Sequence, residues 1–197
     1  MLDPMHSTPR VVAVIGPSAS GKSSATRVLH HRGTIRINPT WTTRPRRRDE
    51  ALGSLEHRFV TEAMFAELDA AGFFLETVEM FGLPFRYGLP PIAPPAAGRI
   101  DVVMLRAPLV GLFRRHVPDL VVYQVEDDPA RAEARLFERR TSVADVRARR
   151  RDNRAELVAG RAVADRVFRN DGTIDDLADR ITEAIAVDAA PLVGVAS

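Results

Sequence analysis

The stretch VVAVIGPSASGKSSATRVL, residues 11–29, contains the pattern that decides the fold. Residues 11–15 form a short apolar run rich in β-branched side chains, which is typical of a strand buried on both faces of a sheet. The run ends at Gly16, and small residues follow as far as Lys22, the only lysine of the chain. Residues 23–33 then predict a helix that ends at a glycine.

The octapeptide GPSASGKS, residues 16–23, satisfies the phosphate-loop pattern G-x-x-x-x-G-K-[ST] between this strand and this helix. Its backbone N–H groups can turn inward around an oxyanion, and the helix adds its positive N-terminal end. We therefore expect ATP with Mg²⁺, with Lys22 on the β- and γ-phosphates and the Ser23 hydroxyl on the metal. The alternative is a tight turn that contains the pattern by chance. The residues predicted to bind the phosphates are Gly16, Ser18, Ala19, Ser20, Gly21, Lys22, Ser23 and Ser24.

The composition indicates one globular domain with room for inserts. The chain has 197 residues, 45% of them hydrophobic and 27% charged. It has no cysteine, which excludes disulfides and thiolate metal sites. No apolar stretch reaches the ~18 residues of a membrane span, and the first ten residues do not resemble a signal peptide. We therefore expect a cytoplasmic protein without a membrane partner; the oligomeric state is not predicted.

Arginine dominates the positive charge: 27 of the 28 lysine and arginine residues are arginines, and the net charge is only +2. They group at RPRRR (44–48) and RARRRDNR (147–154). Proteins that bind nucleic acids usually combine a basic face with interleaved aromatic residues, and neither group contains one. The groups therefore favour a small phosphorylated ligand and no nucleic acid.

The rest of the chain alternates between predicted strands and helices, which indicates an α/β protein with a parallel sheet. Further strands are predicted at 34–37, 100–105, 120–126 and 166–171, and helices at 61–72, 109–117, 129–138 and 173–187. Residues 139–162 also look helical. Residues 38–58 are polar and punctuated by proline, and residues 82–98 carry six prolines, so both segments are expected to be irregular.

Five short motifs in a fixed order resemble the guanylate kinase family over nearly the whole chain. They follow the loop GPSASGKSS and are TTRPRR (42–47), HRFVTEAMFAELDAAGFFLE (57–76), RYG (86–88), ARLFERR (134–140) with the later Arg149, and DRVFRND (165–171). The resemblance implies a P-loop kinase fold with a three-layer core, and transfer of the γ-phosphoryl group of ATP to GMP.

The resemblance also implies a division of the chain. A guanylate-kinase-like domain would cover residues 10–190, between loose tails at 1–9 and 189–197. Its core would comprise residues 10–37, 97–138 and 163–188. Residues 38–96 would form an insert that binds the acceptor, and residues 139–160 a helical lid that closes over ATP and excludes water.

Site residues follow from the family's pattern, position by position. Arg44 and Arg47 would grip the acceptor phosphate, because guanidinium groups bind phosphate oxygens in pairs. Glu76 would accept hydrogen bonds from guanine, and Asn170 would lie beside the ATP base. The resemblance predicts Lys22, Arg44, Arg135, Arg139 and Arg149 as the catalytic residues, and Thr40, Arg44, Arg47, His57, Glu76 and Tyr87 as the acceptor site.

The chain departs from the family's pattern around the acceptor. His57 stands where the family has a tyrosine, Leu105 and Ala107 where it has aspartates, and Leu89 where it has serine or threonine. The stretch between Glu76 and Tyr87 is also two residues longer. These changes leave open a kinase for a sugar phosphate such as ribose 1,5-bisphosphate. A non-catalytic binding module is a further alternative, although such modules typically have a degraded phosphate loop and this loop is intact.

Overall fold

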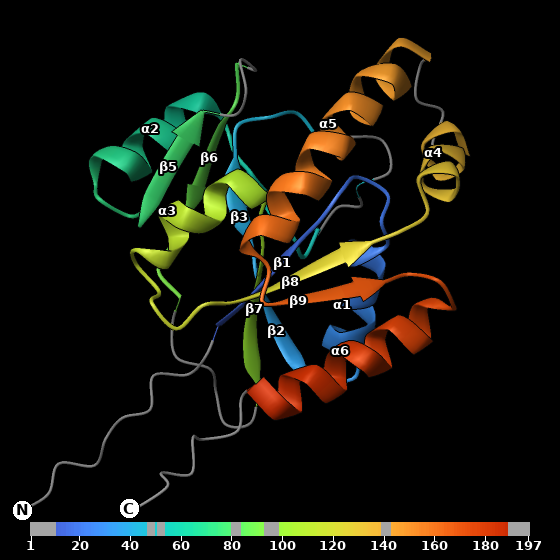
Figure 1. Cartoon of the computed structure of the whole chain (residues 1–197). Helices are drawn as coiled ribbons and strands as arrows, with labels where there is room; N and C mark the ends of the chain where they lie inside the picture. Colours follow the sequence, from blue (N-terminus) through green and yellow to red (C-terminus); the bar gives the residue numbers. More distant parts are fainter. Residues whose placement is uncertain are drawn as a thin grey trace, which may run out of the picture.

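The computed structural model describes residues 11–46, 50, 54–79, 84–92, 99–138 and 143–188, with only the backbone described for 143–150 (Figure 1). Five parallel strands form the main sheet, in the order β2-β7-β1-β8-β9. Their bounds are β1 (Val11–Ile15), β2 (Ile35–Asn38), β7 (Ile100–Met104), β8 (Val121–Glu126) and β9 (Arg166–Arg169). The predicted α/β class and parallel sheet are confirmed.

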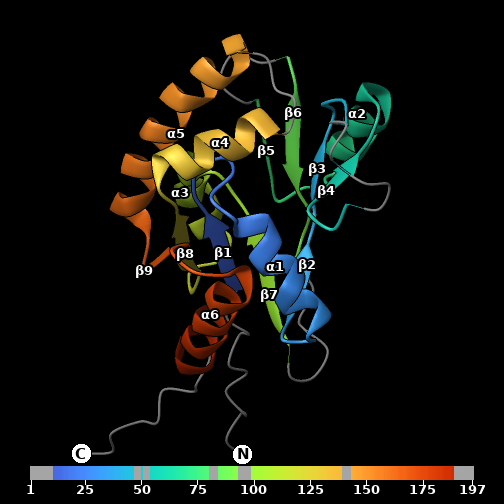
Figure 2. The same ribbon diagram turned by 90° about the vertical axis from the view of Figure 1, so that its right-hand side faces the viewer.

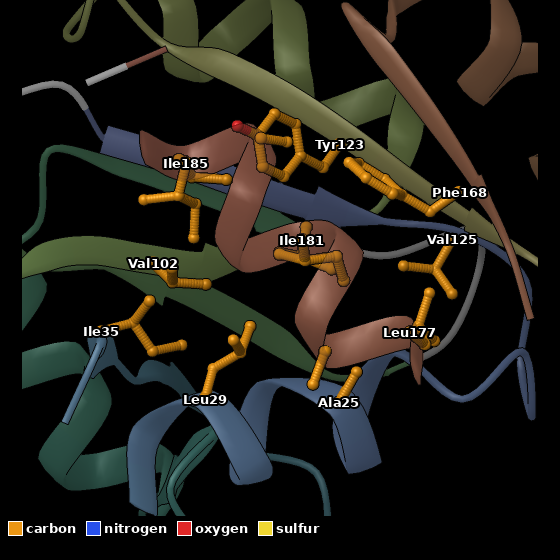
Figure 3. Packing of buried hydrophobic residues seen from close by; sticks show 14 of the residues in the cluster. Ala25, Leu29, Ile35, Val102, Tyr123, Val125, Phe168, Leu177, Ile181 and Ile185 are labelled. Atoms are coloured by element: carbon orange, nitrogen blue, oxygen red, sulfur yellow. The ribbon is translucent and has the colours of Figure 1, made fainter. Parts of the chain in front are cut away.

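Helices cover both faces of this sheet because its central strand is apolar on both sides. Val12 and Val14 of β1 belong to a buried hydrophobic cluster. Ala25 and Leu29 of α1 (Lys22–His31) and Leu177, Ile181 and Ile185 of α6 (Ile174–Asp188) pack into the same cluster (Figure 3). The other three residues of β1 pack against the opposite layer, which contains a 3-10 turn (Ala107–Leu109), α3 (Val110–Arg114) and α5 (Val143–Val163). The result is a three-layer core, as the sequence predicted.

A smaller, four-stranded sheet stands to one side of the core (Figure 2). Its strands are β3 (Thr40–Thr42), β4 (His57–Phe59), β6 (Arg86–Leu89) and β5 (Glu76–Glu79), in the order β4-β3-β6-β5, and α2 (Glu62–Ala70) accompanies them. Two aromatic rings of the turn between α2 and β5 contact both elements of this layer: Phe74 stacks on Phe65 of α2 at 4.7 Å between centroids, and Phe73 meets Trp41 of β3 edge-on at 5.3 Å.

This small sheet corrects two predictions. Residues 38–58 are not irregular throughout, because they contain β3 and β4, and the expected loop at 82–98 contains β6. Each of these strands has only three or four residues, which is too short for a periodic pattern to emerge. The 109–117 helix is also shorter than expected, since a 3-10 turn with Pro108 precedes α3.

The remaining helices follow the sequence closely. Thr61 caps α2 by accepting a hydrogen bond from the Met64 amide at 3.2 Å, and the segment turns at Gly72, where φ is +68°. The helix α4 (Pro129–Glu138) has its predicted bounds, and α5 accounts for the helical pattern after residue 139.

Gly160 sets how closely α5 approaches the sheet. A Cβ atom there would lie 1.7 Å from Oε1 of Gln124, whose amide nitrogen is held by Glu126 at 2.6 Å and by the Leu157 carbonyl at 3.2 Å. Gly111 in α3 has no heavy atom within 4 Å of such a Cβ. We therefore expect Gly160→Ala to destabilise the fold by about 1–3 kcal/mol. Gly111→Ala should be neutral or stabilising by up to ~1 kcal/mol. Urea unfolding measures both, and equal effects would contradict the close approach.

Candidate active site

The phosphate loop lies at the carboxyl end of β1, between β7 and β8, where the strand order reverses. Ligands of open α/β sheets bind at this point. The loop needs its glycines: φ is +136° at Gly16 and +97° at Gly21. A Cβ at Gly16 would lie 2.2 Å from the carbonyl oxygen of Val125, and one at Gly21 would lie 2.4 Å from Nδ2 of Asn170. The glycines of the motif are therefore required by the neighbouring backbone and by a buried amide.

The side chains of Asn170 and Lys22 hold the loop in this shape. Asn170, which is 3% exposed, donates from Nδ2 to the Ser20 carbonyl at 3.0 Å. Lys22 donates from Nζ to the Pro17 carbonyl at 2.9 Å. The hydrogen bond from Asn170 therefore stabilises the conformation of the loop. The predicted place of Asn170 beside the ATP base stays a prediction.

The helices α4 and α5 also contact the loop. Arg135 of α4 pairs with the buried carboxylate of Asp127 and donates from Nε to the Ala19 carbonyl at 3.1 Å. Asn153 of α5 accepts from the Ser18 amide at 2.8 Å and donates to the Ser18 carbonyl at 3.2 Å. Asn153, within the range 139–160 that was predicted as a lid, thus contacts the phosphate loop.

One cavity of about 400 Å³ joins the loop to the small sheet. From the predicted phosphate site it is lined by Gly16, Ser18, Ala19, Lys22 and Ser23. From the predicted acceptor site it is lined by Thr40, Arg44, His57, Glu76 and Tyr87. Ser20, Gly21 and Ser24 belong to the same loop and helix start without lining the cavity. The structure therefore brings together ten residues that the sequence placed in two different sites.

Arg44 is fixed before any ligand binds. It is 7% exposed, forms a bidentate ion pair with Glu50 (Nη1 to Oε2, 2.7 Å), and lies with its Cζ 4.9 Å from the ring centroid of Phe59. The Tyr87 hydroxyl interacts with the same guanidinium group. A stacked and paired guanidinium presents its remaining N–H groups in a defined direction, as binding of a phosphate requires.

His57 and Thr40 meet on neighbouring strands of the small sheet. Thr40 Oγ1 lies 2.7 Å from Nδ1 of His57, and the His57 ring lies edge-on to Tyr87 at 6.3 Å between centroids. The three polar side chains therefore form one wall of the cavity.

The backbone of Glu76 belongs to β5 of the small sheet, but its side chain is held by two residues that follow α3 in the core. Its Oε2 accepts from Nε2 of His116 at 3.1 Å and from Nη2 of Arg115 at 3.2 Å. The His116 hydrogen bond, followed by that of Arg115, holds the pKa of the Glu76 carboxyl below its usual value. Glu76 therefore faces the cavity as an anion over the neutral pH range.

Several charged residues that line the cavity were not predicted from the sequence, among them Glu56, Arg106 and Glu156. Glu156, 4% exposed on α5, accepts from Arg106 Nε at 3.0 Å and from the Ala107 amide at 2.8 Å. Arg106 follows a predicted strand at the edge where ligands bind, which was an available signal. Glu156 lies in an arginine-rich segment whose pattern gave none.

Several predicted features stay predictions. Arg47 and Arg139 lie outside the described residues, and Arg149 lies in the part of α5 of which only the backbone is described. The division into core, insert and lid is likewise untested. Of the departures from the family's pattern, Leu89 and Leu105 line the cavity and Ala107 is buried, so all three are apolar positions in the structure as well.

A phosphate loop at the switch point of a five-stranded parallel sheet, opening toward a second sheet with a pre-oriented arginine, is the architecture of a P-loop kinase. No model of a known protein family matches the chain. Guanylate kinase from Mycobacterium tuberculosis is 34% identical over 157 residues, which cover 76% of this chain and 74% of that enzyme. Guanylate kinase from Symbiobacterium thermophilum is 32% identical over 183 residues, covering 90% and 83%. The chain therefore belongs to the guanylate kinase family, and it is a kinase.

Two further comparisons agree with this assignment. Guanylate kinase from Nitrosococcus oceani is 35% identical over 92 residues, a match that spans 46% of this chain and 45% of that enzyme. The crystal structure of guanylate kinase from Anaplasma phagocytophilum superposes with a TM-score of 0.66 at 22% identity, covering 95% of this chain and 92% of that one. Its likeness shows the fold. Among the described residues, none of the helices has the length and apolar character needed to cross a membrane.

The hydrogen bond from His116 makes a testable electrostatic prediction. We expect His116→Ala to raise the pKa of Glu76 toward its ordinary value, because the largest cause of the lowered pKa is removed. A lowered folded-state pKa stabilises the fold above the unfolded pKa, and this contribution is lost as the pH falls through the folded value. NMR titration of the carboxyl carbon measures the shift. His31→Ala, at an exposed histidine of α1, is the control. An ordinary pKa for Glu76 in the wild type would refute the prediction.

Proposed function

We propose that this kinase transfers the γ-phosphoryl group of ATP to GMP and releases ADP and GDP. The observation that carries the proposal is the shared cavity: the phosphate loop and the predicted acceptor residues open into the same space of about 400 Å³. Two phosphorylated substrates can then meet within one enclosure. Named guanylate kinases with 32–34% identity over most of the chain support the same reaction.

The donor side rests on the phosphate loop. Lys22 can exchange its contact with the Pro17 carbonyl for the β- and γ-phosphates, since the ammonium group is a mobile point charge. The oxygen donors at the cavity fit Mg²⁺, because the Ser23 hydroxyl and a carboxylate line it together. When bound, Mg²⁺ would neutralise charge on the β- and γ-phosphates. Arg135, which donates to the Ala19 carbonyl, would stabilise the charge of the transferring group.

The acceptor side offers complementary groups for both ends of GMP. Arg44 and the Tyr87 hydroxyl would bind the phosphate, and Glu76 would accept hydrogen bonds from the N1–H and amino groups of guanine. An ionised carboxylate can only accept, so the unprotonated N1 of adenine would face it without a donor. A mismatch of this kind costs about 1–3 kcal/mol. The site therefore favours guanine over adenine.

A panel of acceptors tests the proposal. We expect a coupled ADP-release assay to give turnover with GMP at least about tenfold above AMP and UMP in kcat/KM. Lys22→Ala should abolish turnover, because the β- and γ-phosphates lose their mobile counter-ion. Turnover with ribose 1,5-bisphosphate but not with GMP would show a sugar-phosphate kinase instead. Binding of ATP without turnover of any acceptor would show a binding module.

Arg44 tests the acceptor side separately. Arg44→Ala should raise the KM for the acceptor by roughly ten- to a hundredfold, because a charged hydrogen-bond donor to the phosphate is lost. The KM for ATP should change much less, since the phosphate loop is untouched. Arg58→Ala, on the exposed side of β4, is the matched control in the same sheet. Equal increases in both KM values would contradict the assignment of Arg44 to the acceptor.

A further inference from the structure

Among the described residues, four carboxylates line the cavity, and one of them differs from the rest. Three are neutralised by arginines: the pairs are Glu50 with Arg44, Glu76 with Arg115, and Glu156 with Arg106. Glu56 forms no ion pair with any residue that the structure describes. Its Oε2 instead accepts a hydrogen bond from Oγ of Ser23, at 3.0 Å. Glu56 is thus a cavity carboxylate that contacts the phosphate loop and pairs with no positively charged residue that the structure describes.

The backbone places Glu56 there from the opposite side of the cavity. Glu56 directly precedes β4, and its carbonyl accepts from the Thr40 amide at 3.0 Å. Its own amide donates to Oγ of Ser54 at 3.3 Å. Ser23 lies in the first turn of α1, in the core. The contact between Ser23 and Glu56 therefore joins the small sheet to the phosphate loop.

A carboxylate at this position weakens nucleotide binding unless a cation lies beside it. The cavity is expected to receive the several negative charges of a triphosphate, and a carboxylate beside them repels them. A divalent cation between the carboxylate and the phosphates turns this repulsion into attraction. Mg²⁺ suits the position because it prefers oxygen ligands and binds through one or two carboxylates together with substrate phosphates.

At the other edge of the cavity, the residues that the structure describes offer no acid that is free of an arginine partner. After β7 the lining residues are the apolar Leu105 and the cationic Arg106, and Glu156 is already bound to Arg106 and to the Ala107 amide. The described residues contain no group of three or more acidic or histidine side chains that would hold a metal unaided. A metal here would therefore bind jointly with the nucleotide.

We propose that Glu56, with Ser23, holds the Mg²⁺ ion of the bound ATP, either directly or through a metal-bound water. The proposal rests on the proposed function, since it requires a bound nucleoside triphosphate. It assigns Glu56 a role that its place in the sequence does not reveal. Because the Glu56 carbonyl is bound to Thr40, the metal would also tie the acceptor wall to the nucleotide.

Titration calorimetry with a non-hydrolysable ATP analogue tests this assignment without turnover. In the wild type, Mg²⁺ should tighten binding of the analogue relative to EDTA. In Glu56→Gln this gain should fall by about 10- to 100-fold, the usual effect of losing a metal-supporting group. In EDTA, Glu56→Gln should bind the analogue as tightly as the wild type or more tightly, because the repelling charge is gone. Glu67→Gln, the same change on the exposed face of α2, should match the wild type under both conditions.

A double-mutant cycle distinguishes a shared metal from a structural contact. If Ser23 and Glu56 hold the same ion, the double variant Ser23→Ala/Glu56→Gln should lose little more of the Mg²⁺ gain than the larger single variant. Additive losses would overturn the inference. If Mg²⁺ tightens binding of the analogue as much in Glu56→Gln as in the wild type, the assignment of Glu56 to the metal is wrong, while the proposed function is unaffected. Failure of the wild type to bind the analogue at all would overturn both, and thermal melting of each variant identifies losses that come from unfolding.

Discussion

The close approach of Gly16 to the Val125 carbonyl is the constraint on which the site depends. With a Cβ excluded at 2.2 Å, only glycine lets β1 turn into the phosphate loop while β8 remains paired with β1. Gly21 repeats the constraint at the other end of the loop, against Asn170. The loop is therefore shaped by neighbours that are themselves buried. Its amides are positioned by the fold before any phosphate arrives, so that little ordering is left for the ligand to impose.

The charged side chains of the cavity, like the loop amides, are held in position before a ligand binds. Arg44 is buried and paired with Glu50, and Arg106 is paired with Glu156, so neither guanidinium has to be ordered by the substrate. Pairing also limits the cost of burying these charges, since an isolated ion in such surroundings is strongly disfavoured. A phosphate that binds Arg44 does not need to break the ion pair, because a guanidinium has five N–H donors and a carboxylate uses two.

The sequence predicted the core well because long-range and local signals agree there. The apolar run at 11–15, the loop motif and the helix caps each specify one conformation, and together they define the parallel sheet. The small sheet was harder to predict. Its strands have three or four residues, and β3 and β4 are held by pairing with each other rather than by a pattern of their own. Glu56 and Glu156 could not be identified from the sequence, since what marks them is a partner far along the chain: Ser23 and Arg106.

The helix α5 shows why a boundary between core and lid is difficult to draw from sequence. Near its end, Gly160 lies against Gln124, and Arg161 binds Glu126 through two contacts of 2.6 Å. Asn153, two turns earlier, contacts the phosphate loop through two hydrogen bonds to Ser18. Near its C-terminal end, α5 thus packs closely on the sheet. Two turns earlier it makes hydrogen bonds that water or a phosphate can replace. The helical sequence pattern is continuous through this change, because the change concerns the residues that each turn contacts and not the helix itself. The boundary therefore cannot be located from the sequence of α5.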